Sequence, residues 1–315
     1  MKVYTNIADF KPLKNAVCTM GIFDGVHLGH QKILAQVTRT AKELNAESVV
    51  VTLWPHPKSI LQPEGKIKLL CTLEEKIDLM AQQKIDHLIV LPFSLDFSNI
   101  SADYFSKHYI AESIGTKVFI IGYDHRFGKN KEGGFEYLKS HAAEYGFEVK
   151  EIDREDVDNA VVSSTRIREA IEEGDVNEAS HLLGRPYIIS GKVIKGKQLG
   201  RTIGFPTANI EILYKEKLLA KHGVYAVKVS FDDKVFGGMM NIGIRPTFNE
   251  GEPNVEVNIF DFEGDIYDKN VKLELISRLR NEQKFESIDG LIAQLHKDKE
   301  SSIKVLQEYG IEIIL

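Results

Sequence analysis

An apolar run passes directly into a glycine-rich loop and then into a helical pattern in the stretch Ala16-Val17-Cys18-Thr19-Met20-Gly21-Ile22-Phe23-Asp24-Gly25-Val26-His27-Leu28-Gly29-His30-Gln31. The helical pattern continues beyond this stretch, with apolar side chains on one face at Ile33, Leu34, Val37, Ala41 and Leu44. A buried strand that is followed at once by an amphipathic helix is the start of a βαβ unit. The stretch therefore predicts a parallel sheet covered by helices.

The alternation of strand and helix continues through the first half of the chain. Further strands are predicted at the short apolar runs 48–53, 87–91, 117–122 and 147–152. Ser101 and Asp103 supply capping chemistry for a helix that lies between two of these runs. Two short helical stretches then end near Leu183, and the pattern is interrupted by Gly184-Arg185-Pro186. We therefore predict a Rossmann-like α/β domain over residues 1–183.

The remainder of the chain, residues 184–315, is rich in β-strand patterns. Strands are predicted at 187–195, 223–231, 234–241, 255–262 and 271–279, with turn residues between them. A last segment, 288–309, carries apolar residues at helical spacing. These patterns predict an antiparallel β-barrel with a terminal helix packed against it.

Composition limits the classes of function. A chain of 315 residues is long enough for two domains of about 150 residues each. The net charge of −6 and the pI near 6.0 do not favour a nucleic-acid partner. Cys18 and Cys71 cannot form a disulfide framework. The sequence shows neither a signal peptide nor a run of about 18 apolar residues, so we expect a cytoplasmic protein with no membrane partner.

The loop after the first strand predicts a phosphate site. Its glycines let backbone N–H groups approach an anion, and the helix start adds partial positive charge. His27 and His30 can donate hydrogen bonds to phosphate oxygens. Three alternatives are weaker: the glycine spacing does not match a dinucleotide fingerprint, a metal would need further ligands, and two loop histidines can be plain surface residues.

A second helix start with anion-binding residue types lies at Ser163-Ser164-Thr165-Arg166-Ile167-Arg168. Taken alone, ordinary capping by Ser164 and a solvated Arg168 would explain it. In a doubly wound sheet, however, loops at the carboxyl ends of the strands gather in one crevice. We therefore expect this segment and the histidine loop to share one nucleotide.

In the barrel half, the segment 196–209 is too glycine-rich and basic for an ordinary hairpin. Its backbone amides can wrap phosphates. It is not a P-loop, because Gln198 stands where Ser or Thr is required and no helix is expected to follow. Thr207 and Asn209 offer neutral oxygen ligands for Mg²⁺ at nucleotide phosphates, whereas the alternative is turn chemistry after Pro206.

A carboxylate lies in the middle of the strand predicted around Val255-Glu256-Val257-Asn258-Ile259-Phe260. Alternation along the strand puts Glu256 and Asn258 on the face opposite the apolar residues. By itself this indicates a solvated face. Glu256 can also serve as the general base for a hydroxyl group that attacks ATP.

The first domain resembles the FMN adenylyltransferase module of bacterial bifunctional riboflavin kinase/FAD synthetases. The resemblance is carried by residues 23–30 together with residues 164–168. It implies that His27 and His30 bind the ATP phosphates and stabilise charge, without a covalent enzyme intermediate. It also implies that Ser164, Thr165 and Arg168 hold the outgoing phosphates. The ATP-binding residues that it implies are Gly21, Phe23, Asp24, Gly25, His27, Gly29, His30, Asp124, Ser164, Thr165 and Arg168.

Two segments of this domain depart from the family. His125 replaces a more usual aromatic residue next to Asp124, and Trp54 departs from the commoner residue in Trp54-Pro55-His56-Pro57. Trp54 offers a flat surface on which a flavin or adenine ring can stack. Simple packing beside two prolines explains it equally well, and the choice stays open.

The second domain resembles the riboflavin kinase barrel, in the segments 206–209 and 241–248 and the strand around Glu256. The resemblance implies Thr207 and Asn209 at Mg²⁺-ATP, Glu256 as base on the riboflavin 5′-hydroxyl, and Gly200 with Gly204 in a flexible phosphate flap. The segment 278–285 looks like the family's flavin-side loop, without individual roles for its residues.

The two resemblances together predict phosphorylation of riboflavin to FMN and then adenylyl transfer from ATP to give FAD and pyrophosphate. The expected ligands are ATP, riboflavin, FMN and FAD with Mg²⁺, no permanently bound cofactor, and a monomer or weak homo-oligomer. One alternative is an adenylyltransferase for another phosphate monoester, in which the barrel only binds. The other is a catalytically silent flavin-binding or regulatory protein.

Overall fold

The chain folds into two compact units, Met1–Ser164 and Thr165–Leu315, and each is described by itself. The computed structural model describes residues 1–65, 67–122, 125–152, 162–196, 198–244 and 253–311. The two helices between Ser164 and Leu183 are grouped with the second unit. The domain boundary after Leu183, made from the sequence, stays a prediction.

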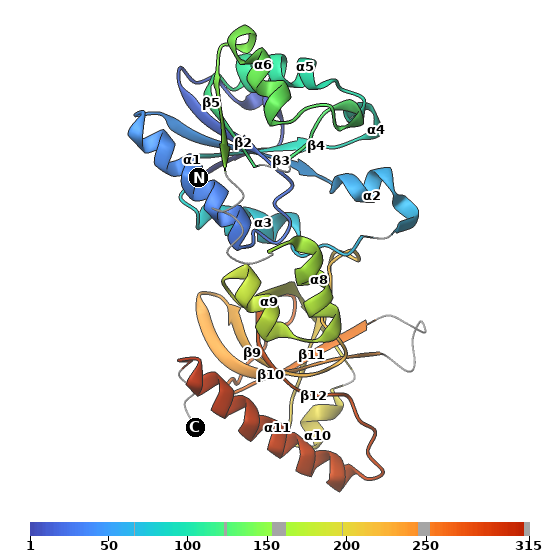
Figure 1. Cartoon of the computed structure of the whole chain (residues 1–315). Helices are drawn as coiled ribbons and strands as arrows, with labels where there is room; N and C mark the ends of the chain where they lie inside the picture. Colours follow the sequence, from blue (N-terminus) through green and yellow to red (C-terminus); the bar gives the residue numbers. More distant parts are fainter. Residues whose placement is uncertain (66, 123–124, 153–161, 197, 245–252, 312–315) are drawn as a thin grey trace. The chain divides into compact units, whose positions relative to one another are not determined.

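The first unit is built on a parallel sheet of six strands in the order β1-β4-β3-β2-β5-β6. The strands are β1 (Lys2–Tyr4), β2 (Ala16–Met20), β3 (Glu47–Trp54), β4 (His87–Pro92), β5 (Thr116–Gly122) and β6 (Glu148–Ile152). Figure 1 shows helices on both sides of this sheet, with α1 on one side and α5 and α6 on the other. The predicted α/β architecture is confirmed.

The helices of the first unit begin at residues that the sequence marks as caps. His27 caps α1 (Leu28–Glu43), and Thr72 and Glu75 form a capping box at α3 (Leu73–Ala81). Ser101 caps α5 (Ala102–Tyr104), which continues as the π-helix η3 (Phe105–Ser113). The other helices are α2 (Pro57–Leu61), α4 (Leu95–Ser98) and α6 (Phe135–Tyr145), and the 3₁₀ turns are η1 (Ile7–Asp9), η2 (Pro63–Gly65) and η4 (Lys129–Lys131).

Alternate residues of the central strands enter separate cores on the two faces of the sheet. Val17 of β2 packs with Val37 and Ala41 of α1. Its neighbour Cys18 belongs to the opposite core, together with Leu138 of α6. Because both faces are covered, strand β2 is buried along its whole length. The carboxyl end of β2, where the loop 21–27 begins, is thereby held in place.

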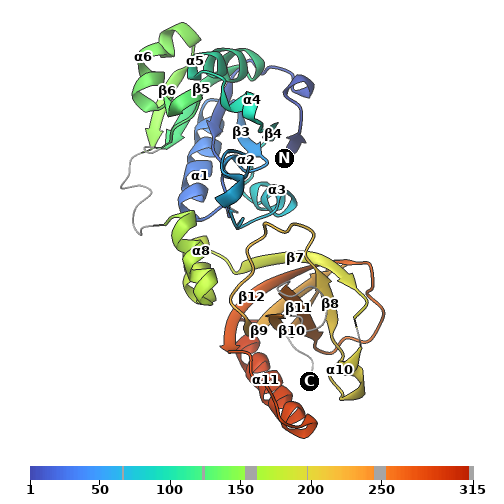
Figure 2. The same cartoon turned by 90° about the vertical axis from the view of Figure 1, so that its right-hand side faces the viewer.

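The second unit contains a closed antiparallel barrel with the strand order β10-β11-β8-β7-β12-β9 (Figure 2). The strands are β7 (Tyr187–Ile194), β8 (Ala208–Glu211), β9 (Gly223–Phe231), β10 (Lys234–Ile244), β11 (Pro253–Ile259) and β12 (Asn270–Arg280). Its helices are α8 (Ser164–Glu173), α9 (Val176–Leu183), α10 (Leu199–Thr202) and α11 (Ile288–Glu308). Buried Leu306 of α11 packs with Ala226, Met239 and Ile276 of the barrel, as the predicted terminal helix should.

Three short elements differ from the sequence analysis. Strand β1 was not foreseen, because it has three residues and lies at the sheet edge, where one side of the strand is unpaired. Strand β8 was taken for a loop, although Asn209 lies inside it. A helix does follow Gln198, since α10 begins at Leu199; Gln198 still lacks the hydroxyl that a P-loop requires.

Candidate active sites

His27 and His30 lie together at the start of α1. The Nδ1 atom of His27 accepts a hydrogen bond from the backbone N–H of His30 at 3.4 Å, which caps the helix. The two rings are stacked, with centroids 3.6 Å apart and an interplanar angle of 18°. A neutral His27 ring that accepts at Nδ1 carries its proton at Nε2. The pair therefore adds ring N–H donors to the helix N-terminus, which attracts anions.

His30 is held in its neutral form. Burial is the main cause, and the electrostatic influence of His27 and of Lys76 adds to it, so the pKa of His30 lies well below the usual value of 6.5. The ring packs edge-on against Phe23, with centroids 5.2 Å apart. Within the described residues, its buried Nδ1 atom has no hydrogen-bond partner. A polar atom of this kind is suited to a ligand.

The lowered pKa of His30 predicts a pH-dependent stability of the first unit. Below pH 6.5 the unfolded chain binds a proton at this residue and the native state does not, so stability falls as the pH falls. The single residue contributes a slope of up to about 1.4 kcal/mol per pH unit. Urea unfolding at pH 5.5, 6.5 and 7.5, followed by the fluorescence of Trp54, the chain's only tryptophan, measures it. We expect a flatter dependence in His30→Gln; equal slopes would contradict the assignment.

The loop before His27 is held from beneath. The buried carboxylate of Asp24 accepts hydrogen bonds from the backbone N–H groups of Leu70 and Cys71, at 3.1 and 3.2 Å from Oδ1. The N–H of Gly25 approaches the Sγ atom of Cys71 at 3.1 Å. These contacts favour a structural role for Asp24, and its predicted contact with ATP stays a prediction.

Glycine is favoured at two positions of the loop for different local reasons. Gly25 has φ of +79°, which favours a residue without Cβ. A Cβ atom at Gly21 would lie 2.8 Å from the ring of Phe23. Phe23 itself is buried under the loop, so its side chain supports His30. Gly29 is buried within the first turn of α1.

The second predicted segment reaches this loop through Ser164, whose Oγ atom donates to the carbonyl oxygen of Asp24 at 3.2 Å. Thr165 and Arg168 belong to the second unit, and their place in the nucleotide site stays a prediction. Asp124 lies outside the described residues. Trp54 ends β3 and has the ammonium group of Lys76 at 5.5 Å from its ring centroid. Its role stays open.

In the barrel, the structure brings Thr207, Asn209 and Glu256 together. Asn209 of β8 is the register partner of Glu256 on β11, so both side chains point to the same face. The Oγ1 atom of Thr207 donates to the carboxylate of Glu256 at 3.4 Å. Asn254 donates to the other carboxylate oxygen at 2.7 Å. Glu256 is thus oriented by two side chains on a partly buried surface, rather than being freely solvated.

The glycines before this cluster allow a close approach of backbone segments. A Cβ atom at Gly200 would lie 2.1 Å from the carbonyl oxygen of Phe205, and Gly204 has φ of +81°. The predicted flexibility of this flap stays a prediction, since Gly200 lies in the short helix α10. A pocket of about 80 Å³ adjoins Thr207 and is lined in part by Arg201, Phe262 and Tyr267.

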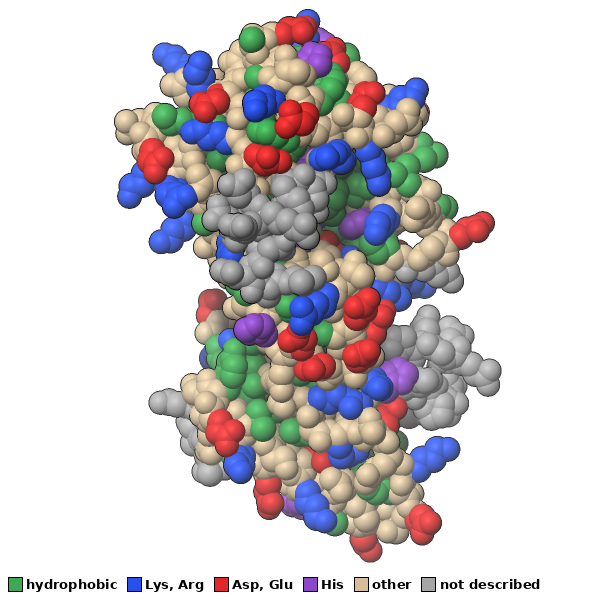
Figure 3. Space-filling model, viewed as in Figure 1, with side chains coloured by type: hydrophobic (Ala, Val, Ile, Leu, Met, Phe, Trp, Pro, Cys, Tyr) green, Lys and Arg blue, Asp and Glu red, His purple; other side chains and the backbone are tan. Residues whose placement is uncertain are grey.

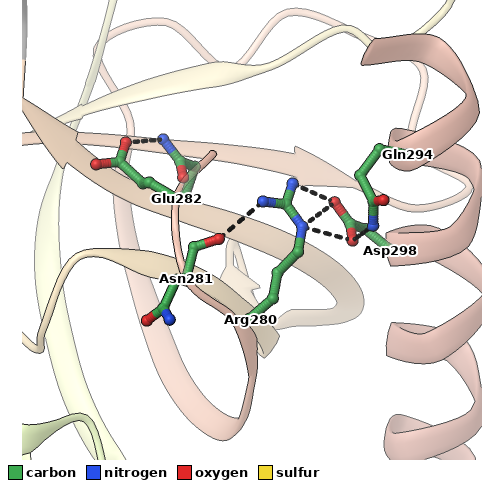
Figure 4. Close-up of polar contacts among 6 residues, drawn as sticks. Arg280, Asn281, Glu282, Gln294 and Asp298 are labelled. Carbon is green, nitrogen blue, oxygen red and sulfur yellow. Dashed lines mark hydrogen bonds and ion pairs between the residues drawn. The ribbon is translucent and has the colours of Figure 1, made fainter. Parts of the chain in front are cut away.

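A partly buried ion pair anchors the end of β12 and the segment that follows it. Arg280 donates from Nε and Nη2 to the carboxylate of Asp298, at 2.9 and 2.7 Å from Oδ1 and Oδ2. Gln294 donates to the same carboxylate at 2.9 Å, as Figure 4 shows. Glu282, two residues after Arg280, accepts from Asn241 at 3.5 Å. Since Asn241 is the register partner of Glu256, the ion pair fixes a segment that borders the Glu256 cluster.

Removing the Asp298 carboxylate should destabilise the second unit. Asp298→Ala leaves the partly exposed Arg280 without its partner, and loss of these charge-assisted hydrogen bonds costs about 2 kcal/mol. Urea unfolding followed by far-UV circular dichroism measures the loss, while the Trp54 transition reports on the first unit. Glu300→Ala, at an exposed position of the same helix, is the matched control. An unchanged circular-dichroism transition in Asp298→Ala would contradict this prediction.

Two residues at these sites were missed by the sequence analysis. Asn254 lies two positions before Glu256 on the same strand, so the period of two would have placed both on one face. Lys76 lies on the apolar stripe of α3, three and four positions before Leu79 and Met80. A lysine in such a stripe was the available signal.

Within the described residues, neither the surface charge nor the helices indicate a further class of protein. Figure 3 shows Lys and Arg side chains interspersed with Asp and Glu on the drawn face of each unit. In the part of the chain that the structure describes, no helix has the length and apolar character needed to cross a membrane. Within the same residues, no cluster of three or more His, Cys, Asp or Glu side chains is arranged to hold a metal ion.

Two family models match the chain in sequence. The FAD synthetase model matches residues 9–166, and the riboflavin kinase model matches residues 183–306. The matches coincide with the α/β sheet that carries His27 and with the barrel that carries Glu256. They favour a two-site enzyme over the two alternatives raised from the sequence.

Curated relatives extend the match over nearly the whole chain. A bifunctional riboflavin kinase/FMN adenylyltransferase from Buchnera aphidicola is 36% identical, covering 98% of this chain and 99% of the relative. Its counterpart from Listeria monocytogenes is 39% identical and covers 91% of each chain. This chain belongs to the family of bifunctional riboflavin kinase/FMN adenylyltransferases.

A solved structure shares the whole architecture. A crystal structure described as a macrolide-efflux protein from Streptococcus pneumoniae matches with a TM-score of 0.85 and 33% identity, and covers 96% of this chain and 98% of that one. The assignment of this chain to an enzyme family rests on the two family models and the curated relatives, and not on the description of this structure.

Proposed function

We propose that this chain phosphorylates riboflavin to FMN at the barrel and adenylylates FMN to FAD at the α/β unit, with ATP as the donor in both steps. Family membership supports the pair of reactions. The contact between Thr207 and Glu256, with Asn209 paired across the strands, is the observation that carries the kinase assignment. Phosphoryl transfer commonly uses metal ligands beside the phosphates together with a carboxylate that accepts the hydroxyl proton.

In the kinase step, Glu256 accepts the proton of the riboflavin 5′-hydroxyl. The hydroxyl oxygen attacks the γ-phosphorus of ATP, the bond to the β,γ-bridging oxygen breaks, and ADP leaves. Asn254 and Thr207 each donate to one oxygen of the carboxylate and so fix its orientation, and both oxygens keep a lone pair that can take up the proton. A general base needs this orientation within hydrogen-bond reach of its proton.

The barrel cluster fits a magnesium ion. Thr207 contributes a hydroxyl oxygen and Asn209 an amide oxygen, next to the carboxylate of Glu256. Magnesium prefers oxygen ligands and is usually held by few protein groups together with nucleotide phosphates. When bound here, it would neutralise charge on the phosphates. Gly200 and Gly204 let the backbone approach these phosphates closely.

In the adenylyl step, an oxygen of the FMN phosphate attacks the α-phosphorus of ATP, and the bond to pyrophosphate breaks. The attacking group is already an anion, so no strong base is required. His27 and neutral His30 donate hydrogen bonds from the helix start, and Ser164, Thr165 and Arg168 hold the outgoing phosphates. Donors that are already oriented stabilise the developing charge without reorganisation.

Product analysis tests the proposed function. Purified protein is incubated with riboflavin, ATP and Mg²⁺, and riboflavin, FMN and FAD are separated by chromatography. The proposed function requires both FMN and FAD. FMN alone would limit the function to the barrel. Unchanged riboflavin, together with no FAD from added FMN, would reject it.

A further inference from the structure

Lys76 is a buried lysine behind the loop of the α/β unit. It is 2% exposed, and its ammonium donates to the carbonyl oxygen of Ile22 at 2.8 Å. It also lies 3.5 Å from the Oγ1 atom of Thr52, which itself donates to the Ile22 oxygen at 3.2 Å. One ammonium therefore ties α3 to the first residues of the histidine loop and to the end of β3.

The same ammonium interacts with the charges of the loop. Burial lowers the pKa of Lys76, and the side chains of Cys71 and Asp24 act in the opposite direction. Its positive charge also acts on His30 and helps to lower the pKa of that imidazole. Lys76 is thus coupled at once to the carboxylate and to the imidazole of one short segment.

The negative charge of Asp24 bears directly on phosphate binding by the loop. Its carboxylate is 4% exposed and belongs to the loop that the proposed function assigns to ATP. A buried negative charge here repels phosphates, and low surrounding polarity strengthens that repulsion. Hydrogen bonds from Leu70 and Cys71 hold the carboxylate but add no net positive charge. An anion site with a built-in carboxylate needs a compensating cation.

We propose that Lys76 is a positioning residue of the adenylyltransferase site, whose ammonium offsets the charge of Asp24 and holds the Ile22 carbonyl so that the loop accepts a triphosphate. The inference rests on the proposed adenylyl transfer. Lys76 acts through the loop and does not contact the reacting atoms. Loss of Lys76 therefore weakens ATP binding more than it lowers the kcat of the bound enzyme.

The test compares Lys76→Met with wild type in the full-length protein. The measured quantities are the Kd of Mg-ATP from Trp54 fluorescence, and the KM for ATP and the kcat of FAD formation from added FMN. Loss of the buried ammonium should raise Kd and KM by about 30-fold, with a smaller change in kcat. Riboflavin phosphorylation is the internal control. Lys42→Met, at an exposed position of α1, is the matched variant.

A charge-compensating double variant separates this role from a merely structural one. Asp24→Asn keeps an oxygen for the backbone amides and removes the negative charge. Lys76→Met combined with Asp24→Asn should therefore bind ATP more tightly than Lys76→Met alone. Lys76→Gln, which can still donate to Ile22, should lose affinity as Lys76→Met does; it also replaces Lys76→Met if that variant lacks a cooperative Trp54 unfolding transition.

Several outcomes would overturn the inference. The first is a folded Lys76→Met protein whose Kd and KM for ATP lie within about threefold of wild type, which corresponds to less than about 0.7 kcal/mol. The second is a double variant that binds ATP no more tightly than Lys76→Met. The third is wild-type affinity for ATP in Lys76→Gln. Wild-type protein that makes no FAD from FMN and shows no Trp54 response to ATP would reject the proposed function as well.

Discussion

Glu256→Ala should lower the rate of FMN formation by about 1000-fold, within the range of 10² to 10⁴ that a positioned general base contributes. The substitution removes the proposed base, while Thr207 and Asn209, the proposed magnesium ligands, remain in place. FAD formation from added FMN should stay largely intact, because we place the adenylyl step at the separate histidine loop of the α/β unit. Chromatographic rates of both products in the same protein preparation measure the effect.

Glu256→Gln separates the base from the scaffold. Glutamine can accept from Asn254 with its carbonyl oxygen, but it cannot take up a proton at neutral pH. We expect it to lose FMN formation nearly as far as alanine does. Equal loss of FMN and FAD formation in either variant would contradict the independence of the two sites. A glutamine variant with wild-type kcat would remove Glu256 from the role of base.

His30→Ala should lower kcat for FAD formation from FMN by about 100-fold, as the loss of one preorganised donor does elsewhere. The imidazole is neutral and its Nδ1 atom is buried without a partner among the described residues. Its removal takes away a donor and also the stacking partner of His27. FMN formation at the barrel should be unaffected, and initial rates with saturating ATP and FMN measure both activities.

His27 requires a different substitution, because it also caps α1. Alanine would cost about 1 kcal/mol in capping and would confuse stability with chemistry. His27→Asn keeps a side-chain acceptor at the cap, since asparagine is a favoured cap residue, but it lacks the ring N–H. We expect an unchanged Trp54 unfolding transition and a loss of FAD formation similar to that of His30→Ala. Near wild-type kcat would show that His27 only caps the helix.

The strand and helix order could be predicted because its signal is local. The short, nearly continuous apolar runs at 16–20 and 87–91 mark buried strands without reference to the rest of the chain. Short elements lack this signal. Strand β8 has only four residues, so the segment 206–209 was taken for a loop, and the pairing of Asn209 with Glu256 was not foreseen.

The candidate sites were only partly predictable. The residue types at 27–30 and at 207–209, and the position of Glu256 on a strand, indicated phosphate-binding sites and a candidate base, and the resemblance to the family was needed to name both reactions. They did not show which side chains support the others. Asn254 on Glu256 and Phe23 under His30 are contacts that depend on the folded geometry. The contact of Asp24 with ATP stays a prediction. In the structure its carboxylate accepts hydrogen bonds from the backbone N–H groups of Leu70 and Cys71.

The sequence by itself determined the α/β and barrel halves, the position of the phosphate loop after a strand, and the residue types of both candidate sites. Periodicity, capping and glycine spacing are all properties of neighbouring residues. Only the tertiary structure decided which ionisable side chains are buried, which groups they contact and how their pKa values shift. Lys76 reaches Ile22 from 54 positions away, and burial by distant segments holds the pKa of His30 low. Such effects arise from desolvation and long-range pairing, which no local pattern records.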